Sequence, residues 1–323
     1  MIRILFKIQT FLSTLVCFSL SAKWNNGNIG IFLKDHPVRT DLRSCVANSS
    51  NEGVWRVRIP REGMKAGIND RMSIMTQLLN LALATCTKLM FPIPCRSLSA
   101  AHSTRQPYNS VISCDHSWDH YVRISHPWLL LESNSSTVPI DDPKHDYFDI
   151  YNFYNWKAGR KEISKLPEVV VVNTTSRQDA YADSIITQYT KGAKFYALHV
   201  RRTDVKHLCD TSIPKVVCNM RAILGNTTLG GRMLRHNLFF MTDEKNSSYH
   251  TELIRELKLI PELLDVMNLD QLVELSLMNE SKMDNYYAFQ IAKSVRSKSE
   301  IFVEMTHQGR CPKTYFAGSQ RFY

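Results

Sequence analysis

Two adjacent arginines at the end of an apolar run are the residues of this sequence best suited to binding chemistry. Phe195–Val200 is apolar, aromatic and β-branched, which predicts a buried strand, and Arg201 and Arg202 follow it directly. In an open α/β sheet, ligands bind at the carboxyl ends of the strands. The planar fork of arginine gives two parallel, charge-assisted hydrogen bonds to a phosphate. The pattern predicts a phosphate site, with Asp204 orienting one guanidinium and His199 as a further donor. A solvated basic turn held by a weak surface ion pair is the alternative.

The six residues from His199 to Asp204, HVRRTD, resemble the HxRRxD motif of the GDP-fucose-dependent O-fucosyltransferases and the α1,6-fucosyltransferases. In that superfamily the motif opens the nucleotide-binding domain, and an arginine contacts the β-phosphate of GDP-fucose. The stretch Gly67–Arg71, GINDR, resembles the Gly-, Asn- and Arg-containing loop that opens the same enzymes, where an apolar helix also follows. The resemblance implies that Gly67, Asn69 and Arg71 lie on the acceptor side; a simple tight turn is the alternative.

Two later stretches extend the resemblance. Phe240–Glu244 is similar to the second motif of the family, a strand that ends in acidic residues, here Asp243 and Glu244. Asp284, followed by an apolar helix and a strand that leads to Thr306, is similar to the third. The resemblance implies that Asp243, Glu244 and Thr306 bind the donor. His307–Gly309 departs from the serine- or threonine-rich loop of the family, which weakens the assignment of Thr306.

The resemblance implies a GT-B-like α/β fold, with two Rossmann-like, doubly wound domains facing across a cleft. We place an N-terminal, acceptor-side domain at residues 23–185 and a C-terminal, GDP-fucose-binding domain at residues 186–323. The residues themselves support an α/β fold for the N-terminal domain. A strand, a glycine-containing loop, an apolar helix and a second strand follow one another there and make a βαβ unit. Those elements are predicted at Val54–Ile59, Pro60–Asp70, Met72–Thr87 and Leu89–Phe91.

Hydrophobic periodicity predicts the remaining elements. Strands are expected at Glu168–Val172, Asn237–Thr242 and Ile301–Met305. Helices are expected at Ser176–Tyr189, Pro214–Leu224, Thr251–Leu259, Leu263–Met267, Leu269–Met278 and Met283–Ser297. Three predicted strands end in polar clusters, which would meet at one edge of a parallel sheet.

The resemblance implies inverting chemistry without a metal or other cofactor. Arg201 and Arg202 would then neutralise the leaving diphosphate. The candidate base is Glu62 or Asp70, which flank the glycine loop, although either could be a surface carboxylate. Metal alternatives are weak: the pair His116 and His120 lacks a third ligand at a recognisable spacing, and Asp141–Asp142 lies in a turn. Asp243 is the carboxylate that could instead hold magnesium.

The composition suits a folded enzyme with an acidic ligand. The chain has 323 residues, of which 44% are hydrophobic and 22% charged, and its formal net charge is +10. It contains no dense Lys/Arg run with interleaved aromatic residues, which argues against a nucleic-acid partner.

Residues 1–22 have the layout of a cleavable signal peptide: Arg3 and Lys7 precede a mostly apolar stretch, Ile8–Leu20, and the small residues Ser21 and Ala22 follow it. A membrane anchor is the alternative, but the stretch is short and interrupted by polar residues. Of eight cysteines, Cys17 lies in this segment, which leaves an odd number and hence at least one free or intermolecular thiol. Six N-x-S/T sequons, at Asn48, Asn134, Asn173, Asn226, Asn246 and Asn279, agree with the lumen of the endoplasmic reticulum or Golgi, or with secretion.

We therefore expect an enzyme that moves fucose from GDP-fucose to a hydroxyl acceptor, with Ser or Thr of a secreted protein domain as the leading acceptor. An α1,6-fucosyltransferase acting on a glycan is the first alternative. A catalytically inactive binding protein that keeps the fold is the second, favoured by the altered loop after Thr306. The expected partners are GDP-fucose and a protein or glycan acceptor, with no nucleic acid and no stable membrane span.

Overall fold

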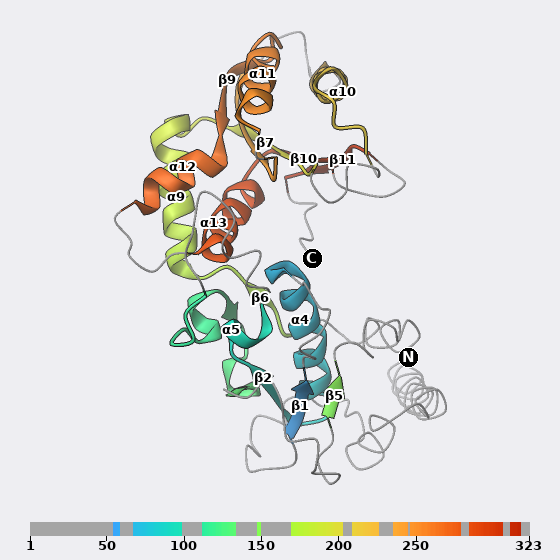
Figure 1. Cartoon of the computed structure of the whole chain (residues 1–323), viewed down its shortest axis with the longest axis vertical. Helices are drawn as coiled ribbons and strands as arrows, with labels where there is room; N and C mark the ends of the chain where they lie inside the picture. Colours follow the sequence, from blue (N-terminus) through green and yellow to red (C-terminus); the bar gives the residue numbers. More distant parts are fainter. Residues whose placement is uncertain are drawn as a thin grey trace, which may run out of the picture. The chain divides into compact units, whose positions relative to one another are not determined.

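A computed structural model describes residues 54–58, 67–98, 112–133, 147–149, 169–202, 209–225, 235–244, 246–278, 284–305 and 311–317 of this α/β protein (Figure 1). The chain divides into two compact units, each described by itself below. Unit 1 comprises residues 1–102 and 111–173, and unit 2 comprises residues 103–110 and 174–323. The division predicted at 185/186 falls inside a helix of unit 2, α9 (Ser176–Thr190). Two Rossmann-like domains facing across a cleft stay a prediction. Among the described residues, every helix falls short of the length and apolarity needed to span a membrane.

Unit 1 is built on a four-stranded parallel sheet in the order β4-β2-β1-β5. Its strands are β1 (Val54–Arg58), β2 (Lys88–Pro92), β4 (Leu130–Ser133) and β5 (Tyr147–Asp149), and a separate antiparallel pair joins β3 (Arg123–Ile124) to β6 (Val172–Asn173). Its helices are α4 (Ile68–Ala84) and α5 (Pro94–Ser97), with short 3-10 turns η1 (Trp118–His120) and η2 (Pro127–Leu129). The predicted βαβ unit is confirmed as β1, α4 and β2, because β1 and β2 pair in parallel.

Helix α4 begins earlier than the sequence predicts. Gly67 is its N-cap, and Asn69, Asp70 and Arg71 lie in the first turn of the helix rather than in a loop. The backbone N–H of Arg71 already donates to the carbonyl oxygen of Gly67, at 3.2 Å. A carboxylate in the first turn is stabilised by the helix dipole, so Asp70 favours helix where a loop was expected.

The segment before β6 is a connector, so the prediction of a buried strand at Glu168–Val172 is wrong for residues 169–171, whereas Val172 begins β6 and Glu168 lies outside the described residues. Val169 and Val171 are exposed, and Val170 alone between them is buried. The cause is Asn80, on α4, whose Oδ1 accepts the backbone N–H groups of Val169 and Val170, both at 2.9 Å. The Nδ2 of Asn80 donates to the carbonyl of Val170, at 2.9 Å. A buried amide therefore replaces the strand ladder as the partner of this backbone.

We predict that Asn80→Ala lowers the free energy of unfolding by roughly 2–4 kcal/mol, because buried backbone groups lose their partners. Urea denaturation measures the loss. Gln77→Ala is the matched control on the same helix, since among the described residues its amide reaches only Ser73, at 3.5 Å, and a change within about 0.5 kcal/mol is expected there. Equal losses in the two variants would contradict the role assigned to Asn80.

Unit 2 is built on a five-stranded sheet in the order β11-β10-β7-β8-β9. Its strands are β7 (Phe195–Val200), β8 (His236–Thr242), β9 (Leu263–Asn268), β10 (Ile301–Met305) and β11 (Lys313–Phe316). Besides α9, its helices are α10 (Ile213–Gly225), α11 (Ser247–Leu257), α12 (Leu269–Leu277) and α13 (Asn285–Ser297). Only β11 runs antiparallel to its neighbour, so β7 is the centre of a parallel sheet, as its apolar sequence predicts.

One element of unit 2 is predicted wrongly. Leu263–Met267, expected as a helix, is strand β9 at the edge of the sheet. Burial alternates along its first residues, with Leu263 at 6% exposure and Leu264 at 61%. A five-residue apolar stretch does not separate the periods of helix and strand. The parallel pairing with β8 makes this stretch a strand rather than a helix.

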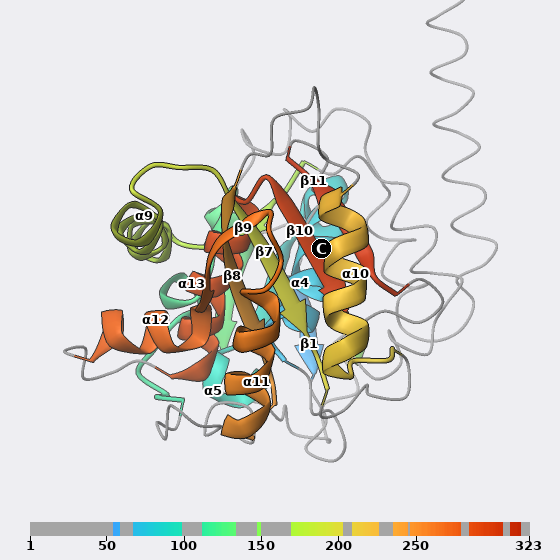
Figure 2. The ribbon, with the colours of Figure 1, turned by 90° about the horizontal axis from the view of Figure 1, so that it is seen from above.

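The two faces of this sheet carry different helices (Figure 2). Leu198, Val200 and Phe240 belong to one apolar cluster with residues of α10 and α11. Because side chains alternate along a strand, His199 and its neighbours project to the other face, where α13 contacts β7 and packs against α9 and α12. The chain leaves β7 toward α10 and returns through α13 to β10. The strand order therefore reverses between β7 and β10, which is where open α/β sheets bind ligands.

Candidate functional site

The carboxyl ends of three adjacent parallel strands lie at the same level. Val200, the last residue of β7, pairs with Thr242 of β8 on one side and with Met305 of β10 on the other. Arg201 and Arg202 follow β7, and Asp243 and Glu244 follow β8. The prediction that these polar strand ends meet at one edge is confirmed for β7 and β8. Asp204 and Thr306 lie outside the described residues.

Arg202 is held through both its backbone and its side chain. Its backbone N–H donates to Oδ1 of Asp243, at 2.6 Å. Its Nε lies 3.5 Å from Oε2 of Glu244, and its guanidinium carbon lies 4.0 Å from the ring centroid of Tyr249. The side chain is still 30% exposed. The fork is thus fixed in place and accessible to a ligand, which is what phosphate recognition requires.

Tyr249, near the start of α11, is a residue that the sequence analysis missed. Its hydroxyl donates to the carbonyl oxygen of Thr211, at 2.9 Å, which fixes the ring beneath Arg202. Burial raises the pKa of Tyr249 to about 12, against the opposing effect of Arg202. The phenol therefore stays neutral, and its face offers a cation–π surface to the guanidinium. An aromatic residue in the first turn of the helix after β8 was the available sequence signal.

The turn that carries Glu244 is cross-linked by short-range hydrogen bonds. The backbone N–H of Glu244 donates to Oγ1 of Thr242, at 3.1 Å. The Nε2–H of His250 donates to the carbonyl of Glu244, at 2.6 Å. The N–H of Asn246 donates to Oε1 of Glu244, at 3.1 Å, so the carboxylate next to Arg202 has a defined position.

A third carboxylate, that of Asp270, lies in the first turn of α12. Asp270 accepts the backbone N–H of Thr242 with its Oδ2, at 3.1 Å. Burial raises the pKa of Asp270 to about 7, the bond from Thr242 opposes the rise, and the charge of Asp243 adds to it. Asp270 thus joins Asp243 and Glu244 at this edge, and it titrates near neutral pH.

We predict that Asp270→Asn removes a pH dependence of stability. An unfolded aspartate ionises near pH 4, so between about pH 4 and 7 the folded protein binds more protons and loses stability as the pH rises. The asparagine variant keeps an oxygen for Thr242 and should be more stable than the wild type at pH 8, but not at pH 4. Melting temperatures across this range test it, with Asp265→Asn on β9 as the control. Parallel curves for wild type and Asp270→Asn would refute the assignment.

The structure separates His199 from Arg202. His199 lies on the face of the sheet toward α13, its side chain is only 13% exposed, and its Nδ1 is 3.7 Å from Oε1 of Glu304. Burial lowers the pKa of His199, although Glu304 opposes this. Arg202 instead packs on Tyr249 of α11, on the opposite face. Arg201 is exposed at the end of β7. Of the donor residues predicted, the structure brings together Arg202, Asp243 and Glu244.

The acceptor-side residues of unit 1 have different environments. Arg71 is fully buried, and its Nε donates to the carbonyl oxygen of Ser97, at 2.7 Å, so it ties α4 to α5. Gly67 and Asn69 are half-buried, and Asp70 is exposed in the first turn of α4. Glu62 lies outside the described residues. Asp70 is therefore the candidate base whose surroundings the structure describes.

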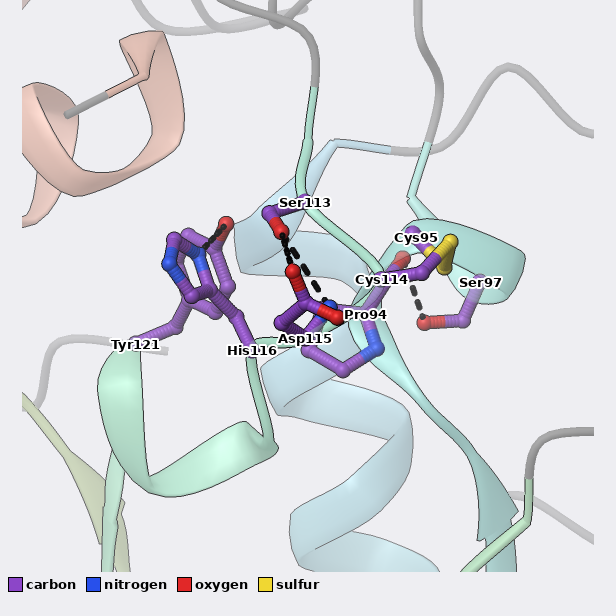
Figure 3. Close-up of a disulfide and its surroundings, with 8 residues drawn as sticks. All are labelled: Pro94, Cys95, Ser97, Ser113, Cys114, Asp115, His116 and Tyr121. Atoms are coloured by element: carbon purple, nitrogen blue, oxygen red, sulfur yellow. Dashed lines mark hydrogen bonds between the residues drawn. A yellow bond between two sulfur atoms is a disulfide. The ribbon is translucent and has the colours of Figure 1, made fainter. Parts of the chain in front are cut away.

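A disulfide fixes the segment that carries His116 and His120, the histidine pair considered above as metal ligands. Cys95 and Cys114, with Cα atoms 5.1 Å apart, join α5 to the chain before η1 (Figure 3). The rings of His116 and His120 stack with centroids 3.9 Å apart, and Nδ1 of His116 lies 3.4 Å from the hydroxyl of Tyr121. Within the described ranges, no three His, Cys, Asp or Glu side chains gather into a possible metal site.

A second disulfide lies beside the reversal of strand order. Cys209, just before α10, is bonded to Cys311, just before β11, with Cα atoms 5.8 Å apart. Cys218 is a free, exposed cysteine on α10. The free thiol expected from the cysteine count therefore has a candidate within the described part of the chain.

Comparisons with known proteins give remote similarity only. No protein-family model and no curated protein matches the chain. A crystal structure of fucosyltransferase NodZ from Bradyrhizobium is similar at 10% sequence identity and a TM-score of 0.39, over 83% of this chain and 100% of that chain. A structure of NodZ alpha-1,6-fucosyltransferase soaked with GDP-fucose is similar at 11% sequence identity and a TM-score of 0.37. That match covers 81% of this chain and 99% of the other chain. These TM-scores are too low to transfer a fold or a function, so we base the function on the site residues.

Proposed function

We propose that this protein transfers fucose from GDP-fucose to a hydroxyl acceptor, with Ser or Thr of a secreted protein domain as the leading acceptor. The observation that carries the proposal is the fixed, accessible guanidinium of Arg202 at the carboxyl end of the central strand β7. This edge suits the diphosphate of a nucleotide. The resemblance of HVRRTD to the fucosyltransferase motif points to GDP-fucose among sugar nucleotides.

In the proposed reaction, the acceptor oxygen forms a bond to C1 of fucose while the bond from C1 to the β-phosphate oxygen breaks. The electron pair leaves on GDP, and positioned cationic donors stabilise that charge. Arg202 is the main donor, with Arg201 beside it. Because Glu244 approaches Arg202 at Nε, the Nη edge of the fork is the part that would engage the phosphate. The proposal needs no metal.

Attack from the side opposite GDP inverts the configuration at C1, and a base takes the acceptor proton. We assign this role to Glu62 or Asp70. Asp70 is exposed at the start of α4, so it is open to solvent and to an acceptor. We place the reaction in the lumen of the secretory pathway. Asn173 and Asn246, two of the six sequon asparagines, are exposed and open to glycosylation there.

We predict that Arg202→Ala lowers the rate of transfer roughly a hundredfold or more, as loss of one oxyanion donor does. Arg202→Lys should not restore it, because an ammonium group lacks the planar fork. Arg255→Lys is the matched control on α11, where the guanidinium pairs with Glu252 and Glu256 at the surface. Initial rates of fucose transfer measure the effect. Near-normal turnover in Arg202→Lys would exclude a phosphate clamp.

The proposal is tested by incubating the full chain with labelled GDP-fucose and a panel of protein domains and glycans. We expect transfer that survives EDTA and is not raised by magnesium or manganese. Transfer to glycans alone would favour an α1,6-fucosyltransferase. Stabilisation by GDP without transfer to any acceptor would favour an inactive binding protein. A thermal shift with another nucleotide and none with millimolar GDP would contradict the proposal.

A further inference from the structure

A second polar cluster lies on the other face of the unit 2 sheet, and the proposed chemistry does not use it. His199 of β7 and Glu304 of β10 are direct partners in the parallel ladder. Tyr315 of β11 and Arg296 of α13 complete the cluster. It lies one residue before the carboxyl ends of β7 and β10, where the strand order reverses.

Glu304 is held at one oxygen and turns the other toward the imidazole. The hydroxyl of Tyr315 donates to Oε2 of Glu304, at 3.2 Å. Oε1 lies 3.7 Å from Nδ1 of His199, beyond hydrogen-bond distance, and this buried Nδ1 has no hydrogen-bond partner among the residues that the structure describes. A buried donor without a partner is costly. A hydrogen bond between the two groups requires an approach to about 2.9 Å.

The charges around the ring favour one protonation state. Burial lowers the pKa of His199, Arg296 from α13 lowers it further, and Glu304 and Asp243 act in the opposite direction. The imidazole is therefore neutral near pH 7. A neutral imidazole has one N–H and one bare nitrogen. A carboxylate beside Nδ1 favours the proton on Nδ1, which leaves Nε2 as an acceptor.

We propose that Glu304, held by Tyr315, is a positioning residue that fixes His199 in the Nδ1–H tautomer, so that Nε2 meets the donor nucleotide as a hydrogen-bond acceptor. His199 then reads a hydroxyl or N–H group of the nucleotide. This differs from the sequence expectation that His199 donates to phosphate. The part that concerns the nucleotide rests on the proposed function, and the tautomer does not.

The tautomer is measured first, without any ligand, by ¹⁵N–¹H correlation spectra of the ¹⁵N-histidine-labelled chain. His199→Gln identifies the signals of His199. We expect the Nδ1–H tautomer at pH 7 in the wild type and a shift toward Nε2–H in Glu304→Leu. An Nε2–H tautomer in the wild type, or one that Glu304→Leu leaves unchanged, would overturn the proposal.

Nucleotide affinity is measured next, by titrating GDP into the wild type and the variants. Glu304→Leu should weaken GDP binding roughly tenfold, as loss of one hydrogen bond does, and Tyr315→Phe should weaken it less. The effect should fall on the KM for GDP-fucose more than on kcat. Glu300→Leu is the matched control, because Glu300 contacts another imidazole, that of His236, at 3.2 Å and at the opposite end of the strands.

The outcomes separate the two proposals. A tautomer shift with unchanged GDP affinity would refute the link from Glu304 to the nucleotide. Failure of the wild type to bind GDP would refute the proposed function, while the spectra still decide whether Glu304 positions His199. Equal loss of GDP binding in Glu300→Leu and Glu304→Leu would show a general structural effect and overturn the assignment.

Discussion

The parallel register of β7 between β8 and β10 is the constraint on which the rest of unit 2 depends. Val200 pairs at once with Thr242 and Met305, so three strands end at one level. A slip of one residue would turn every side chain of β7 to the opposite face. His199 would then lie among the apolar residues under α10 and α11, and Leu198 would face the polar cluster. The pairing register of β7 with β8 and β10 thus fixes both the side chains on each face and the position of the arginines.

The site after β7 is organised before any ligand arrives. Arg202 is bound through its backbone by Asp243, contacted at Nε by Glu244 and supported by the ring of Tyr249. Fixed charges of this kind need little reorganisation during a reaction, which is how oriented donors stabilise a leaving anion. The same arrangement has a cost, because Asp243 and Asp270 bring two carboxylates to one edge. Burial and this proximity hold the pKa of Asp270 at about 7.

The sequence predicts the elements that rely on long apolar runs and misses those decided by tertiary contacts. β7, β8, β10, α10 and α13 carry clear patterns and lie close to the predicted bounds. β9 was assigned as a helix because five residues do not distinguish the two periods. The apolar sequence around Val170 predicts a strand, but the backbone of Val170 bonds to the side-chain amide of Asn80 instead of a neighbouring strand. Glu304 contacts the motif only after the chain has folded, so no spacing in the sequence marks it. Tyr249 is marked only by its place in the first turn of the helix after β8.

The central claim is that Arg202 recognises the terminal phosphate of the diphosphate. A double-mutant cycle tests it most directly: GDP and GMP are each titrated into the wild type and into Arg202→Gln by calorimetry. The account predicts that the substitution weakens GDP binding roughly a hundredfold and changes GMP affinity little. That difference is a coupling of ~3 kcal/mol between Arg202 and the terminal phosphate. Equal loss for both nucleotides, or no loss for GDP, would contradict it, since Arg202 would then not contact the phosphate that distinguishes them.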